Sequence, residues 1–97
     1  MRIEGSTIIF KSDEWFYLKE KHGVKPNTVR VLNVDEYNKI MKTGLKKIRI
    51  VHKQNPEEYF EREITDISDI SPIVGACGGK FIFIFSWKHE EGEEWMK

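Results

Sequence analysis

The sequence predicts a single α+β domain, in which a small curled antiparallel sheet or a small β-barrel packs with about two helices. Short runs of β-forming residues recur along the chain, and two segments with helical patterns interrupt them. The length of 97 residues suits one domain and is short for two. A hydrophobic share of 39% beside a charged share of 33% is typical of a folded, soluble chain. We expect residues 1–89 to form the domain and the acidic residues 90–97 to form a frayed tail.

A strand and a helix are expected at the start of the chain. Residues 7–10 are apolar and rich in β-branched side chains, which predicts the first strand. Ser12 is a favourable N-cap for a helix that Gly23 would end. The side chains expected to face the core from this helix are Trp15, Phe16 and Leu18.

A second strand and a second helix follow. Pro26 disfavours a helical conformation at the residue before it, so the chain should leave the first helix extended. Residues 28–32 then alternate as a strand, with Thr28 and Arg30 on one face and two valines on the other. Residues 35–43 have helical spacing, and Gly44 is a suitable stop.

The second half of the chain predicts a hairpin and one further strand. Residues 46–52 and 59–67 have the pattern of strands, and the turn formers at 55–58 lie between them. Residues 81–87 are apolar on both faces, so we expect them to form a central strand.

Charge is balanced overall but unevenly distributed. Residues 1–53 hold twelve Lys/Arg and six Asp/Glu, a net charge of +6, whereas residues 54–97 hold four and ten, a net charge of −6. Two solvated faces explain this distribution, and a basic patch for nucleic acid is the alternative. A net charge of zero argues against strong non-specific DNA binding, which requires many phosphate contacts.

The sequence predicts a cytoplasmic protein without a metal or cofactor. No apolar run approaches the roughly 20 residues that span a bilayer, and no secretory signal is recognisable at the N-terminus. The single cysteine, Cys77, has no partner for an internal disulfide. The histidines and Cys77 also lack the paired spacing of zinc ligands.

The segment from Gly23 to Arg30 is the most informative part of the sequence. Lys25 lies where the helix is expected to give way to a strand, and Thr28 and Arg30 project from the same face of that strand. Two cations and a hydroxyl would then converge at one end of the sheet, where they could hold a carbonyl, carboxylate or phosphate group. The alternative is a helix stop followed by a strand whose polar face is turned to solvent.

This segment resembles the signature G-x-K-x-x-E-x-R of the ASCH family, small barrels related to the RNA-binding PUA fold. Gly23, Lys25 and Arg30 fall at the Gly, Lys and Arg positions, and Thr28 replaces the Glu. A threonine there is similar to the branch of small acetylcytidine amidohydrolases, although Pro26 replaces the first threonine of that branch. The chain also looks like short uncharacterised phage and prophage proteins. The resemblance implies a PUA-like β-barrel.

Three functions are open on this basis. The first is binding of RNA, a nucleotide or a nucleoside in a basic cleft, with Lys25, Thr28, Arg30 and Arg49 as ligand-binding residues. The second is hydrolysis of an acylated nucleoside, in which the resemblance implies catalytic roles for Lys25 and Thr28. The glutamate that this chemistry needs is unassigned, and Glu61 and Glu63 are the candidates. The third is an interaction domain with a protein partner; no membrane partner is expected, and the oligomeric state is left open.

Overall fold

A computed structural model describes residues 1–75 and 78–88, which form six strands and three helices. Cys77 and the expected tail at 90–97 lie outside the described residues. The elements in chain order are β1 (Arg2–Glu4), β2 (Thr7–Ser12), α1 (Glu14–Lys21), β3 (Asn27–Leu32), α2 (Val34–Lys42), β4 (Lys47–His52), β5 (Tyr59–Asp69), α3 (Ser71–Val74) and β6 (Phe81–Trp87).

The strands of the described residues form one six-stranded sheet in the order β1-β2-β4-β5-β6-β3. The α+β class is therefore confirmed. The sheet is mixed rather than antiparallel, because β2 and β4 pair in parallel while the other neighbours are antiparallel. This parallel pair arises because the chain passes through α1, β3 and α2 before β4 returns beside β2.

The curl of the sheet comes mainly from β5, the longest strand. Its first part pairs with β4 and its second part with β6, and the register shifts between Ile64 and Asp66. Such an irregularity bends a strand and increases its twist. The predicted hairpin of β4 and β5 is confirmed by the pairing of Val51 with Tyr59. β6 lies between β5 and β3, so it is an interior strand as expected.

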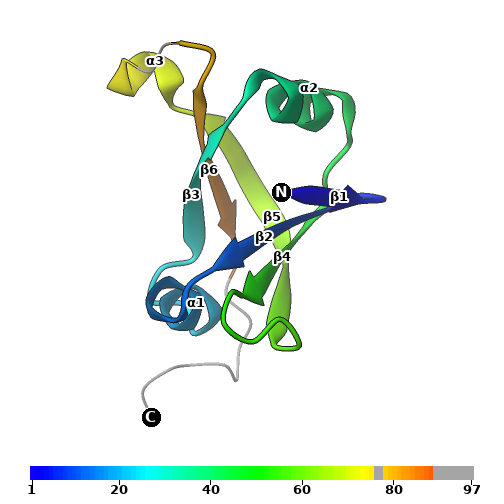
Figure 1. Cartoon of the computed structure of the whole chain (residues 1–97), viewed down its shortest axis with the longest axis vertical. Coiled ribbons are helices and arrows are strands. Elements are labelled where there is room, and N and C mark those ends of the chain that lie inside the picture. The colour runs from blue at the N-terminus through cyan, green and yellow to red at the C-terminus, as the bar shows by residue number, and fades with distance from the viewer. Residues whose placement is uncertain (76–77, 89–97) are drawn as a thin grey trace.

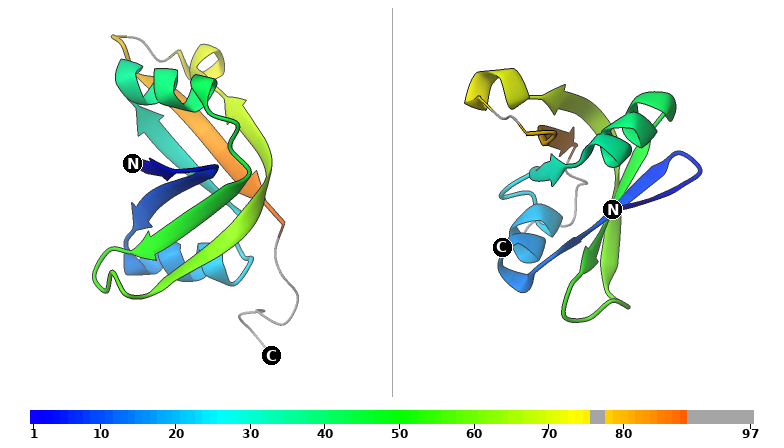
Figure 2. Two further views of the ribbon diagram at one scale, coloured as in Figure 1. Left: turned by 90° about the vertical axis from the view of Figure 1, so that its right-hand side faces the viewer. Right: turned by 45° about the horizontal axis from the view of Figure 1, so that its top comes forward.

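The curled sheet does not close into the barrel that the resemblance implies. α1 covers one end of the sheet and α2 the other, with β3 and β6 on one side of the fold and β1 on the opposite side (Figures 1 and 2). β1 pairs only with Thr7–Ile9 of β2, and β3 does not pair with the remaining part of β2. We call the unpaired boundary between β3 and the end of β2 the seam. Main-chain hydrogen bonds across it would close a barrel, but the Arg30 side chain bridges it instead.

Apolar side chains from both ends of the chain meet inside the curl. Phe83 and Phe85 of β6 are 3% and 0% exposed, and the Phe85 ring lies 5.1 Å from that of Phe10. Tyr37 of α2 stacks on Phe81 at 4.2 Å, which fixes α2 over one end of the sheet. Among the described residues, no helix is both long and apolar enough to cross a membrane.

The orientation of α1 differs from the sequence-based prediction. Asp13, not Ser12, is the N-cap, and its carboxylate accepts from the Phe16 amide. Trp15 and Phe16 are 66% and 47% exposed, so neither is the core residue that we expected. The helix instead buries Tyr17 and Glu20, which lie three residues apart on one face.

Candidate functional site

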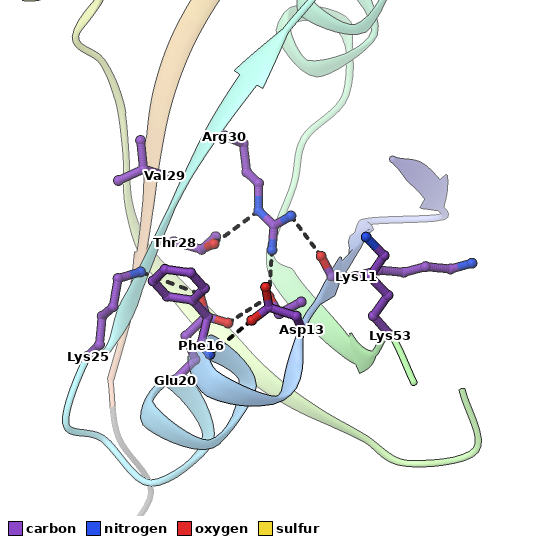
Figure 3. Close-up of a pocket in the computed structure, with 10 residues that line it drawn as sticks. Lys11, Asp13, Phe16, Glu20, Lys25, Thr28, Val29, Arg30 and Lys53 are labelled. Atoms are coloured by element: carbon purple, nitrogen blue, oxygen red, sulfur yellow. Dashed lines mark hydrogen bonds and ion pairs between the residues drawn. The ribbon is translucent and has the colours of Figure 1, made fainter. Parts of the chain in front are cut away.

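A pocket of about 400 Å³ opens at the seam between β2 and β3. Its walls come from the end of β2, α1, the loop before β3, the first half of β3 and Lys53 directly after β4 (Figure 3). Lys25, Thr28 and Arg30 all line it, so the structure brings together the three residues that the sequence placed at a common site. Gly23 lies in the loop between α1 and β3 and has a φ of 79°, a backbone conformation that favours glycine.

The two faces of β3 are arranged so that its polar side chains point inward. Thr28 is only 2% exposed, whereas Val29 and Val31 are 49% and 62% exposed. The alternative of a solvent-facing polar side is therefore wrong. The reason is non-local: the inner face of β3 meets polar groups of β2 and α1 rather than a purely apolar core.

Arg30 is the central group of the seam. Its Nε donates to Thr28 Oγ1 at 3.0 Å, its Nη1 to the Lys11 carbonyl at 2.8 Å and its Nη2 to Ser12 Oγ at 2.7 Å. The guanidinium also lies over the Phe10 ring, 4.7 Å from the centroid. Burial lowers the pKa of Arg30, and attraction to Glu20 and Asp13 opposes this shift only in part.

Glu20 supplies the buried carboxylate of the pocket, and sequence reasoning missed it. Its Oε1 accepts from Ser12 Oγ at 2.8 Å, and its Oε2 lies 3.5 Å from Lys25 Nζ. The Lys25 ammonium also donates to the Asn27 carbonyl at 2.9 Å. Glu20 is 1% exposed, so these partners offset the loss of its hydration. The available signal was its spacing of three residues from Tyr17, which places both on the buried face of α1.

The other predicted site residues lie elsewhere. Arg49 and Glu61 face each other on β4 and β5, with Nη2 and Oε2 2.7 Å apart, and neither lines the pocket. Arg49 Nε also donates to Glu61 Oε2 at 2.8 Å, and this hydrogen bond raises the pKa of Arg49. Glu63 is exposed on β5 and also does not line the pocket. Arg49, Glu61 and Glu63 are therefore not brought to Lys25, because β4 and β5 are separated from the seam by β2 and β6.

Charge around the pocket is predominantly positive. Lys11, Lys25, Arg30 and Lys53 line it, against Asp13 and Glu20, which leaves a formal surplus of two positive charges. Phe16 adds an aromatic ring at the edge of α1, and Lys25 Nζ lies 5.6 Å from its centroid. No group of three or more metal-ligating side chains occurs among residues 1–75 and 78–88.

The chain matches no protein family, no curated protein and no solved structure. Its function must therefore be inferred from the geometry and charge of the pocket.

Proposed function

We propose that the pocket binds a nucleotide-sized ligand through an anionic or carbonyl oxygen. The observation that carries this proposal is the surplus of positive charge around a volume of about 400 Å³, which is in the size range of small-molecule sites. Glu20 is already paired with Lys25, so it does little to repel an incoming anion.

Arg30 supports an anionic ligand in particular. All three of its hydrogen-bond acceptors are neutral oxygens: a threonine hydroxyl, a serine hydroxyl and a main-chain carbonyl. A guanidinium has five N–H donors, so two remain for a ligand. Because burial disfavours the charged form of Arg30, an anion bound beside it would be stabilised by a poorly compensated charge.

Phe16 supports a ligand with a flat ring. It is 47% exposed and lines the pocket, so a nucleobase could stack on it. The zero net charge of the chain favours a small ligand over a long nucleic acid. The resemblance of Gly23, Lys25 and Arg30 to the ASCH signature supports the same class of ligand.

Calorimetric titration tests this function with a panel of nucleosides, their 5′-monophosphates and short single-stranded RNAs. Phe16→Ala should weaken binding about 5- to 150-fold, the loss of one stacking contact. Trp15→Ala is the matched control, because Trp15 is the adjacent, more exposed aromatic on α1 and does not line the pocket. If no compound binds, or if both substitutions weaken binding equally, the proposal is wrong.

A test of charge complements the test of stacking. Lys53→Ala should weaken binding of the monophosphates more than of the nucleosides, and most at low salt. Lys47→Ala is the control, because Lys47 is exposed on β4 outside the pocket lining. Equal effects of the two substitutions would show that the positive charge of the pocket does not contribute to phosphate binding.

Hydrolysis of an acylated nucleoside is a second candidate. It is supported by one specific contact, the 3.5 Å between Glu20 Oε2 and Lys25 Nζ in a pocket that also contains Thr28. A carboxylate, an amine and a hydroxyl in one pocket are the groups that acyl transfer requires. Release of acetate from N4-acetylcytidine, lost in Glu20→Gln, is the expected result; the absence of release from the wild type would rule out this substrate.

A further inference from the structure

Ser12 is the hydroxyl with the most reactive surroundings in the pocket. Its Oγ donates to Glu20 Oε1 at 2.8 Å and accepts from Arg30 Nη2 at 2.7 Å. Ser12 and Glu20 are 5% and 1% exposed, and both line the pocket. A hydroxyl held between a carboxylate and a guanidinium has a proton acceptor on one side and a cation for its developing charge on the other.

Thr28 has different surroundings. Its Oγ1 accepts a hydrogen bond from Arg30 Nε at 3.0 Å, and no acceptor for its own proton is found among the described side chains. Nucleophilic attack by a hydroxyl requires a base within hydrogen-bond reach. In this pocket Ser12 meets that requirement and Thr28 does not.

The remaining groups suit acyl transfer. Each of the two terminal nitrogens of Arg30 keeps one N–H that the Lys11 carbonyl or Ser12 does not use. These donors adjoin Ser12 Oγ, where a carbonyl oxygen would develop negative charge during attack. Lys25 Nζ pairs with Glu20 Oε2, the carboxylate oxygen that does not contact Ser12. Glu20 Oε1 therefore accepts the hydrogen bond from Ser12 Oγ.

We propose that Ser12 is the nucleophile of an acyl transfer to water, with Glu20 as its general base and Arg30 as the oxyanion donor. The substrate class is a small carboxylic ester or amide. This proposal rests on the second candidate function and differs from it in assigning the attacking hydroxyl to Ser12 rather than Thr28.

The reaction balances without an added reagent other than water. Ser12 Oγ forms a bond to the carbonyl carbon while its proton moves to Glu20, and the carbonyl oxygen takes up the electron pair. The C=O double bond then re-forms, the bond to the leaving group breaks, and the proton on Glu20 passes to the leaving group. Water attacks the acyl-serine in the same way, and Ser12 regains its proton as the carboxylic acid departs.

Labelling with an alkyl fluorophosphonate tests the nucleophile without knowledge of the substrate. The full-length protein is treated with the probe, digested, and the modified residue identified by mass spectrometry. We expect the phosphonyl adduct on Ser12, and a loss of labelling of at least about 100-fold in Glu20→Gln, the effect of removing a general base. Circular dichroism checks that the variant remains folded.

Ser68 provides the matched control. It lies on β5 away from the pocket and donates to the Asp66 carboxylate, so it forms the same kind of hydroxyl–carboxylate pair in an exposed position. Ser68→Ala should leave the labelling unchanged. An adduct on Ser68 as readily as on Ser12 would show that such a pair alone explains the reactivity.

Turnover of p-nitrophenyl acetate separates this proposal from the functions on which it builds. Turnover by the wild type with an acetyl adduct on Ser12, and loss of both in Ser12→Ala, supports it. An adduct on Thr28 or Lys25 overturns the Ser12 assignment and leaves hydrolysis in place. No labelling and no turnover by the wild type overturns catalysis altogether, while the calorimetric test of ligand binding stands separately.

Discussion

Replacing Tyr17 with phenylalanine should make the protein less sensitive to alkaline pH. Tyr17 is 0% exposed on the inner face of α1, with its ring 4.9 Å from His52 and 5.4 Å from Phe60. Burial raises its pKa from 10.0 to about 12, and the nearby Glu58 carboxylate adds to the shift. Loss of the phenol proton is therefore less favourable in the folded protein than in the unfolded chain.

The sign and size of the effect follow from proton linkage. In the unfolded chain Tyr17 loses its proton near pH 10, whereas in the folded protein it keeps it to about pH 12. Between these values the folded state binds more protons, so the free energy of unfolding falls as the pH rises. A difference of two pH units corresponds to about 2.7 kcal/mol. Below about pH 9 this contribution is fully present and does not change.

Urea unfolding between pH 8 and 12, followed by circular dichroism, measures this contribution. The buried Tyr17 hydroxyl makes no well-formed hydrogen bond, so Tyr17→Phe should match the wild type within about 1 kcal/mol at pH 8. At pH 12 it should be more stable than the wild type by about 2 kcal/mol. Tyr59→Phe, which removes a hydroxyl from a 52% exposed ring, should follow the wild type. Parallel curves for wild type and Tyr17→Phe would refute the reasoning.

Two further substitutions test the core and the seam. Phe85→Ala should lower the free energy of unfolding by about 3–5 kcal/mol, because Phe85 is fully buried. Val31→Ala, on the exposed face of β3, should lower it by less than about 1 kcal/mol. Thermal melts compare the two variants, and equal losses would place β6 at the periphery. Arg30→Met should remove three hydrogen bonds, one within β3 and two across to β2, at about 1 kcal/mol each. It should also speed hydrogen exchange of the β3 amides, and unchanged exchange would mean that Arg30 does not stabilise the seam.

The elements that depend on local sequence were predictable. The hairpin of β4 and β5 and the final strand follow from alternation and turn residues, and the structure confirms them. The turn at Gly23 and the convergence of Lys25, Thr28 and Arg30 were also predictable, because a strand places alternate side chains on one face. Helix α1 was harder: its sequence offers Trp15 and Phe16 as core residues, and the structure exposes both.

What the sequence determined by itself is therefore the α+β class, most of the strands and three residues of the pocket. Only the tertiary structure decided which glutamate joins them. An isolated glutamate in a helix predicts solvent exposure, because burying a carboxylate is unfavourable without partners. Here Ser12 at the end of β2 and Lys25 in the loop before β3 supply those partners, because the packing of α1 against the sheet turns Glu20 toward both of them. The tertiary structure also decided the parallel pairing of β2 with β4 and the seam bridged by Arg30, because these join segments that are distant in sequence.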